Sequence, residues 1–481
     1  MKTEFLSHLP TKVIKGIKGF QLDAFLIAYE GWRRGLTLRW YQDETDECKM
    51  HRLNSSTSGK FFSLSSPERS HYFFRSRGDK VGNEDVNICR DKEKTKELLK
   101  KAQVPIPLGK EFTSDDEEAI INYATKIGFP VVIKPVTGSM GRGVFINIQN
   151  EEEFKEVLSH FKNKLKYKKC IVEKHYNGKE YRVYVVGNEA ISAINRVPAN
   201  VVGNGKDSIT NLIDKKNKQR KKNPYLAVKP IKIDFEVNKM LKAKGYDEES
   251  IPAKDEKVFL RALINLSAGG DPIDETADLT DEVKHIAVTA LKALPSIPHA
   301  GVDVIVDPTD KTKGVVLEIN ATAEIAFHSF PLQGDPKDLP AKIIDYYFPE
   351  TLNNDKTNFY FDYRSILRPL RTWSARLVEV TPPPMGEIYV EKYVLKGSSI
   401  EMRFLRRIRR EALKNNLHGY VERINSNKVE VKVLGVKQSV IEDFYRFCKK
   451  GSKKSIIENT TRNLIEINRD DVFKIGFELI K

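Results

Sequence analysis

Hydrophobic and polar residues follow two rhythms along the chain. Stretches such as "GFQLDAFLIAYEGWRRG" and "DEVKHIAVTALKALPS" space apolar residues three or four positions apart, which predicts amphipathic helices. Shorter stretches such as "VVIK" and "HAGVDVIVD" are rich in valine and isoleucine, which predicts strands. The two kinds interchange along the chain. We therefore expect an α/β (α+β) protein in which helices pack on sheets.

The chain has 481 residues, too many for one hydrophobic core, so several domains are expected. Punctuation by glycine and proline predicts a small N-terminal α/β domain over residues 1–88 and a larger domain over 89–350. A proline-bearing segment, 351–386, reads as a linker. Residues 387–481 then follow the order strand, helix, strand, strand, helix, strand, which predicts a ferredoxin-like sandwich.

The stretch "VVIKPVTGSMGRGVFINI" (131–148) ends a strand in Lys134 and then runs through a glycine-punctuated loop into a second strand. A phosphate-binding P-loop or Rossmann turn would open a helix instead. Gly138, Gly141 and Gly143 would let backbone N–H groups approach phosphate oxygens, with Lys134 as a point charge beside them. An ordinary hairpin with a glycine-rich turn explains the stretch equally well.

Acidic residues further along raise the case for a nucleotide site. In "IVEKHYNGKE", residues Glu173, Lys174 and His175 end a strand and suit a backbone hinge for an adenine, while Glu180 suits the hydroxyl groups of a ribose. In "GVDVIVD" and "VVLEIN", Asp303 stands among valines, a costly place for an unpaired carboxylate. Glu318 and Asn320 are two apart on one strand and share a face. Three such oxygen ligands predict a site for Mg²⁺, with Mn²⁺ as the alternative.

From about Arg90 to Pro349 the sequence resembles the ATP-grasp ligases. The resemblance is strongest to the ligase half of cyanophycin synthetase and the ATP-grasp half of bifunctional glutathione synthetases, and weaker to D-alanine–D-alanine ligases. It is carried by "DKEKTKELLKKAQVPIP", "VVIKPVTGSMGRGV", "EKHYNGKEYRVYVVG", "RVPANVVGNGKDSITNLI", "LRALINLSAGGDPIDET" and "AGVDVI…LEINA". Together these stretches cover more than half of the chain in the family order.

The resemblance implies an ATP- and Mg²⁺-dependent ligase that joins a carboxylate to an amine through an acyl phosphate. It assigns Lys92 and Lys134 to the phosphates and Arg261 to stabilising the acyl phosphate. It assigns the loop from Gly138 to Gly143, with Ser139 and Met140, to a lid that excludes water. Small amino acids or peptides are the expected substrates.

The chain departs from the family near the expected amine site. A proline, a glycine and an arginine of the cyanophycin synthetases are replaced by Ala323, Glu324 and Ala326, and two residues of the "LRRNANLS" pattern by Ala262 and Leu263. These departures leave the substrate open. In "SHYFFRSRGDK", three basic residues are candidates for binding a carboxylate, and a basic surface strand explains them equally well: Arg75, Arg77 and Lys80.

The C-terminal stretch "ALKNNLHGYVERINSNKVEVKVLG" resembles acylphosphatases. That family needs an arginine opening the first helix and an asparagine after "GYV", and an ungapped match puts Leu405 and Arg423 there. A gap would restore Arg403 but not the asparagine. We therefore expect a non-catalytic module. Its first helix carries five arginines that could grip an anionic partner, namely Arg403, Arg406, Arg407, Arg409 and Arg410.

Composition narrows the class further. Hydrophobic residues make up 40% of the chain and charged residues 31%. No apolar run approaches the length of a membrane span and no signal peptide is visible, so a cytoplasmic enzyme without membrane contact is expected. The four scattered cysteines form no metal-binding spacing. The net charge of +15 admits a second function class, a protein that binds an anionic polymer such as nucleic acid. No nucleic-acid motif supports that reading, and we expect a homo-oligomer.

Overall fold

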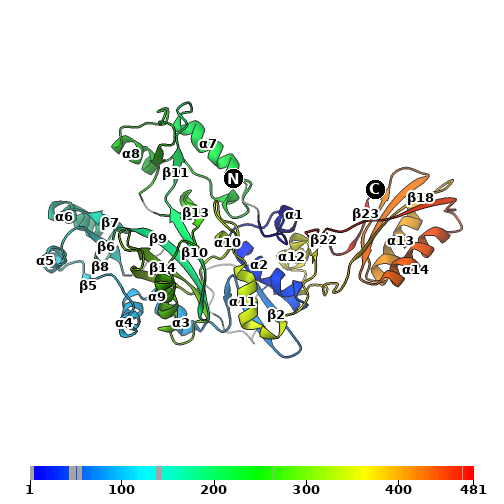
Figure 1. The fold of residues 1–481 in the computed structure, drawn as a ribbon, viewed down its shortest axis with the longest axis horizontal. Helices are drawn as coiled ribbons and strands as arrows, with labels where there is room; N and C mark the ends of the chain where they lie inside the picture. The colour runs from blue at the N-terminus through cyan, green and yellow to red at the C-terminus, as the bar shows by residue number, and fades with distance from the viewer. Residues whose placement is uncertain are drawn as a thin grey trace.

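The structure is a computed structural model that describes residues 5–42, 50, 57–136, 143–262, 264–468 and 470–480. Several lobes surround a central sheet, and a C-terminal module lies at one end of the molecule (Figure 1). Helices and strands interchange along the chain, as the hydrophobic pattern predicts. None of the helices within the described ranges is long and apolar enough to cross a membrane.

The N-terminal unit is an antiparallel sheet of order β17-β1-β2-β3-β4, packed against one helix. That helix, α2, is buried almost all round because it also contacts α11 of the next unit. Its side chains join a hydrophobic core shared with the central sheet, so the two units are one packed body. The elements are α1 (Thr11–Ile14), α2 (Phe20–Arg33), β1 (Thr37–Tyr41), β2 (Phe61–Ser65), β3 (Ser70–Phe74) and β4 (Arg77–Gly78).

A second lobe, here called the β5–β8 lobe, has a four-stranded antiparallel sheet of order β5-β8-β6-β7 with its own core. The predicted hairpin is present, since β6 and β7 pair directly. Helix α5 begins after Asp116, and Thr113 is the last residue of the preceding strand. The elements are α3 (Asn83–Arg90), α4 (Lys92–Lys101), β5 (Gly109–Thr113), α5 (Glu117–Ile127), β6 (Val131–Pro135), β7 (Phe145–Ile148), α6 (Glu151–Ser159), the π-helix η1 (His160–Lys164) and β8 (Lys169–Lys174).

The central sheet has the order β13-β10-β9-β14-β15 and is antiparallel throughout. Helix α9 covers one face, and α10 and α11 contact β10 on the other. The register places Asp303 opposite both Glu318 and Arg182. The elements are β9 (Lys179–Val186), β10 (Glu189–Val197), β13 (Asp271–Asp274), α9 (Asp281–Lys292), β14 (His299–Val306), β15 (Gly314–Asn320), α10 (Ala326–Ser329) and α11 (Leu339–Tyr347).

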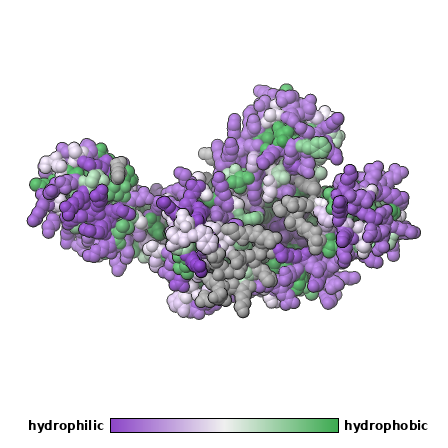
Figure 2. Space-filling view, turned by 180° about the vertical axis from the view of Figure 1, so that it is seen from behind, coloured by the Kyte–Doolittle hydropathy of each residue, from purple (hydrophilic) through white to green (hydrophobic). Residues whose placement is uncertain are grey.

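Between β10 and β13 the chain forms the α7–α8 lobe, which stands above the central sheet in Figure 1 and has its own small core. Viewed from behind, the surface is hollowed between this lobe and the β5–β8 lobe (Figure 2). The elements are β11 (Asn200–Val202), α7 (Ile209–Arg220), η2 (Leu226–Val228), α8 (Phe235–Ala243), β12 (Lys257–Phe259) and η3 (Leu266–Ala268).

The segment 351–386 is folded, so its interpretation as a linker was wrong. Strand β17 is the edge strand of the N-terminal sheet, and Leu367 and Leu370 of α12 are fully buried. Only residues 380–388, with the three prolines, connect β17 to the C-terminal module without a helix or strand. The elements are η4 (Pro349–Thr351), β16 (Phe359–Tyr360), α12 (Tyr363–Arg371) and β17 (Leu377–Glu379).

The C-terminal module confirms the predicted ferredoxin-like order. Its sheet runs β21-β18-β20-β19-β23, and α13 and α14 pack on it around a separate core. A short strand, β22, pairs with β16 and ties the module to the body. The elements are β18 (Tyr389–Lys396), α13 (Met402–Lys414), β19 (His418–Arg423), β20 (Lys428–Gly435), α14 (Gln438–Lys450), β21 (Asn459–Leu464), β22 (Phe473–Lys474) and β23 (Phe477–Ile480).

Candidate active site

Two lysines from different elements meet at one buried carboxylate. Lys96 of α4 and Lys134 of β6 each place Nζ 2.6 Å from an oxygen of Glu173, which is 3% exposed. Burial opposes ionisation of Glu173, but the two ammonium groups hold its pKa below the usual range. Burial also lowers the pKa of Lys134, and Glu173 counteracts it. The carboxylate therefore offsets part of the cost of burying the Lys134 ammonium group.

Two arginines of the central sheet pair with a second set of acidic residues. Arg182 of β9 donates to both oxygens of Asp303, and Arg196 of β10 donates to Asp303 Oδ2 at 2.8 Å and to Glu180. Burial opposes ionisation of Asp303, and Arg182 with Arg196 keeps its pKa low. The close packing needs Gly301, because a Cβ there would lie 2.6 Å from Arg182 Cδ. The mid-strand carboxylate is thus paired, as its cost in an apolar strand demands.

The two groups adjoin at Glu318. Its carboxylate lies 3.9 Å from Lys92 Nζ and 4.0 Å from Arg182 Nη2, and it accepts a hydrogen bond of 3.0 Å from Asn320 Nδ2. Lys92 opens α4 directly after Asp91, whose side chain caps the helix. Lys92 thus connects α4, which also carries Lys96, to the carboxylates of the central sheet.

Glu318 and Asn320 at the edge of the central sheet offer oxygen donors for Mg²⁺, whereas both oxygens of Asp303 accept from Arg182 and Arg196, which an ion at Asp303 would have to displace. The register sets Asp303 opposite Glu318, and Asn320 follows two positions along the same face. Two carboxylates and an amide oxygen are hard oxygen donors of the kind that Mg²⁺ prefers. The Glu318 side chain is 40% exposed, so a solvated ion has access to it. The neighbouring lysines suit the phosphates that such an ion would accompany.

A second acidic group does not fit a metal. His8, Glu30 and Asp338 are close enough together to surround an ion. Lys356 and Arg34, however, already lie 2.7 Å and 2.8 Å from Glu30. Protein cations hold the place that a metal would take.

The predicted hinge residues are largely engaged by the protein. The N–H groups of Lys174 and His175 bind the carbonyl groups of Leu108 and Pro130. Lys174 Nζ also donates to Gly128 O and Phe129 O, at 2.8 and 3.0 Å. Glu173 points at the lysines, and Glu180 is paired with Arg196. A nucleotide would have to displace Arg196 to use Glu180, and the hinge and ribose roles stay predictions.

Most of the predicted lid lies outside the described residues, including Gly138, Ser139, Met140 and Gly141. Gly143 is described and has a φ of 71°, in the left-handed region. A Cβ at this position would lie 2.6 Å from the Tyr167 ring. Both the backbone and the neighbouring ring therefore require glycine where the loop rejoins β7.

Arg261 contacts none of the three lysines among the described residues. Its guanidinium pairs with Asp234 and Glu236 at the start of α8 and donates to Ala268 O at 3.2 Å. None of its interactions with described residues involves Asp303 or the lysines. Its predicted catalytic role remains a prediction.

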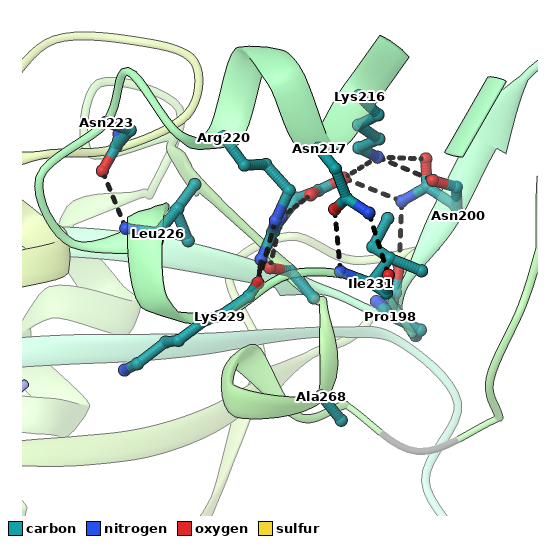
Figure 3. A network of polar contacts seen from close by, with 12 residues as sticks. Pro198, Asn200, Lys216, Asn217, Arg220, Asn223, Leu226, Lys229, Ile231 and Ala268 are labelled. Carbon is teal, nitrogen blue, oxygen red and sulfur yellow. Dashed lines mark hydrogen bonds and ion pairs between the residues drawn. The ribbon is translucent and has the colours of Figure 1, made fainter. Parts of the chain in front are cut away.

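The lysine-rich run at 215–222 is only partly exposed to solvent. Lys216 Nζ binds Asn200 O at 2.7 Å and Asp271 Oδ2 at 2.5 Å (Figure 3). Arg220, 1% exposed, donates to Asp271 Oδ1 at 2.8 Å and to the carbonyl of Lys229. This face of α7 fixes the segment that carries Lys229 over the central sheet, while the other lysines of the run stay outside.

Sequence reasoning missed Lys96, Arg182 and Arg196. Lys96 is four residues after Lys92, so helical spacing alone puts both on one face of α4. Arg182 interrupts the apolar strand "YRVYVV", the same signal that singled out Asp303. Arg196 carried no such signal, because its role depends on the pairing of β10 with β9.

Comparison with known proteins is consistent with this arrangement. Residues 89–217 match the RimK-like ATP-grasp domain, and residues 391–475 match acylphosphatase. The chain is 37% identical over 274 residues to a cyanophycin synthetase of Synechocystis, covering 55% of this chain and 31% of that protein. It is 29% identical over 358 residues to the glutathione biosynthesis bifunctional protein of Clostridium perfringens, covering 72% of this chain and 43% of the other.

Among solved structures, the bifunctional glutathione synthetase of Pasteurella multocida is similar, with a TM-score of 0.48 and 30% identity over 62% of this chain and 41% of that one. The chain thus spans about a third of the length of the cyanophycin synthetases that it matches.

Proposed function

We propose that this chain, in which an ATP-grasp fold precedes a ferredoxin-like acylphosphatase domain, is an ATP-dependent carboxylate–amine ligase. The observation that carries the proposal is the continuity of the site. Lys92 Nζ lies 3.9 Å from Glu318, which stands opposite Asp303 and beside Asn320. Cations for a polyphosphate and oxygen ligands for a divalent ion thus share one surface.

The reaction proceeds in two balanced steps. An oxygen of the substrate carboxylate attacks the γ-phosphorus of ATP, and ADP leaves. The amine nitrogen then attacks the carbonyl carbon of the acyl phosphate, the bond to the phosphate oxygen breaks, and phosphate leaves with an amide formed. The amine loses a proton to solvent or to a base. Bound Mg²⁺ would neutralise charge on the phosphates, with Asp303, Glu318 and Asn320 as its ligands.

The side chains of this chain supply position and charge. Lys92 and Lys134 would hold the phosphates, and Lys96 would remain as a partner of Glu173. Arg182 and Arg196 fix the orientation of Asp303. Two relatives, cyanophycin synthetase and the glutathione biosynthesis protein, support small amino acids or peptides as substrates.

The test is a screen for phosphate release from ATP–Mg²⁺ in the presence of single amino acids, with Asp303→Asn and Glu318→Gln beside the wild type. Each variant removes one charge from the ion's ligands, and we expect turnover to fall by at least about a hundredfold, the scale of removing one electrostatic contact to a transition state. Asp307→Asn, at the exposed end of the same segment, is the matched control and should keep full activity. Phosphate release by either site variant near the wild-type rate would refute the assignment.

A second candidate function rests on α13. Five arginines of α13 are exposed, and none of them forms an ion pair with a described residue: Arg403, Arg406, Arg407, Arg409 and Arg410. An anionic polymer could occupy that face. If no amine supports turnover in the screen, polymer binding becomes the better proposal.

A further inference from the structure

Six arginines are buried among the described residues, and one of them is different. Arg33, Arg34, Arg77, Arg182 and Arg220 each donate hydrogen bonds to protein oxygens. The Arg75 guanidinium donates no hydrogen bond to any described residue, and its Nε is buried without a partner. A guanidinium has five N–H donors, and leaving them unmade in the interior is costly.

The surroundings of Arg75 do not compensate for this cost. Its guanidinium carbon lies 3.4 Å from the centre of the Phe20 ring, and its nearest acid, Asp23, is 3.8 Å away. Asp23 is itself committed, because its Oδ1 accepts the N–H groups of Ile325 and Ala326 at 3.0 Å. A structural ion pair in this molecule looks different, since Arg182 holds Asp303 with two donors. The Arg75 guanidinium therefore lies near one carboxylate but forms no hydrogen bond with it.

The backbone of Arg75 supports the same conclusion. Its φ is 59°, in the left-handed region that non-glycine residues rarely adopt. Such conformations persist only where the surrounding structure holds them, and they cluster at ligand-binding sites. The next residue, Ser76, anchors it by donating a hydrogen bond of 2.5 Å to Ala323 O.

Arg75 also lies beside the turn that leaves the proposed metal ligands. Ala323, which Ser76 holds, donates its N–H to Asn320 O at 3.3 Å. Glu324 follows, and it lies 3.0 Å from Lys229 Nζ. Burial lowers the pKa of Arg75, while Asp23 and Glu324 act on it in the opposite direction. The cluster thus combines one unsatisfied cation with two nearby carboxylates.

We propose that Arg75 binds the free carboxylate of an amino-acid or peptide substrate, the one that does not react. A carboxylate matches the planar fork of a guanidinium with two hydrogen bonds. The reacting carboxylate loses its charge in the first step. The fixed charge of Arg75 therefore suits a second carboxylate that stays ionised throughout the reaction. Asp23 and Glu324 disfavour a purely anionic ligand and favour one that also carries an ammonium group. This inference rests on the proposed function and names the substrate group that this part of the site recognises.

The test measures binding to the full-length chain, separately from turnover. Each of the twenty amino acids, and for each that binds, its α-carboxamide, is titrated into the wild type by calorimetry. We expect at least one amino acid to bind, and its carboxamide to bind at least tenfold more weakly. Arg75→Gln should weaken binding of the acid at least tenfold and leave the carboxamide unchanged, and Arg75→Lys should fall between.

Arg39→Gln, a half-exposed arginine of the same sheet, is the matched control and should bind like the wild type. Melting curves of all variants show whether each is folded. Equal binding of the acid to the wild type and to a folded Arg75→Gln would overturn the inference, as would the absence of any amino acid that binds. A chain that binds the acid through Arg75 but releases no phosphate from ATP would keep this inference and refute the ligase.

Discussion

At the scale of single residues, the site depends on opposite charges that burial forces into contact. Glu173 receives two lysines and is 3% exposed, whereas Glu111 on the neighbouring strand pairs with Lys169 at the surface. The two pairs have similar distances, 2.6 Å and 2.8 Å, yet very different surroundings. Solvent screens the surface pair and leaves it nearly neutral in energy. A buried carboxylate that serves two ammonium groups cannot be removed without leaving them uncompensated.

We predict that Glu173→Gln lowers the free energy of unfolding of the β5–β8 lobe by about 3 kcal/mol, the usual cost of breaking a buried pair. Glu111→Gln, the matched control, should cost less than about 1 kcal/mol. Hydrogen exchange across residues 109–174 would report both. A loss in Glu173→Gln no larger than in Glu111→Gln would show that the buried lysines do not depend on this carboxylate.

At the scale of elements, α13 carries the two candidates for the phosphate-binding arginine that the resemblance to acylphosphatases implies. In an ungapped match Leu405 falls at that position, and it is fully buried in the module core. Arg423 ends β19 and points its Nε at Asn425 O, 3.4 Å away. An arginine carries only donors, so it cannot accept a hydrogen bond from an attacking water. Arg403 is exposed in the first turn of α13.

We predict that the chain does not hydrolyse benzoyl phosphate above the rate in buffer, because both the cradle and the water-orienting group are lacking. Arg423→Asn should stay inactive as well, since a buried Leu405 leaves no arginine in the cradle. The double variant Leu405→Arg with Arg423→Asn introduces both missing groups and is the positive control. Clear hydrolysis by the wild-type chain would mean that this module is an active enzyme.

At the scale of the whole molecule, buried histidines couple the fold to pH. Burial lowers the pKa of His8 and His299 to about 3 and that of His418 to about 4, and it holds that of His328 well below its usual range. An unfolded histidine titrates near 6.5. Between these values the unfolded chain takes up protons that the folded chain refuses. The contribution of these histidines to the free energy of unfolding therefore falls as the pH drops from about 6.5 towards 4, while Asp23 and Asp338, whose pKa burial raises to about 7 and about 6, contribute in the opposite direction.

His418 gives this a local test, because its Nδ1 accepts the Gly476 N–H at 3.0 Å inside the C-terminal module. We predict that His418→Asn, which keeps an acceptor there, reduces the loss of the module's urea stability between about pH 7 and about pH 5. Hydrogen exchange over residues 389–480 would follow the module alone. The exposed His285→Asn should leave the pH dependence unchanged. An identical dependence in wild type and His418→Asn would exclude His418 as a source of the acid sensitivity.

The sequence by itself determined the elements and the candidate donors. Helical and strand periodicities are local, so α2, α9, β14 and β15 could be predicted from neighbouring residues alone. Glu318 and Asn320 share a face because strand geometry repeats every two residues, whatever the rest of the fold does. The ferredoxin-like order of the last domain followed from the same rhythms.

Only the tertiary structure decided which charges meet. Arg182 reaches Asp303 across 121 positions of sequence, and Lys96 meets Glu173 from another element. The segment 351–386 joins the N-terminal sheet through β17, which pairs with the edge of β1. Arg75 and Arg77 are two positions apart, yet the guanidinium of Arg75 is left without a hydrogen bond among the described residues and that of Arg77 donates to Val81 O. Burial and strand pairing join residues distant in sequence, so local pattern could propose these side chains but not their partners.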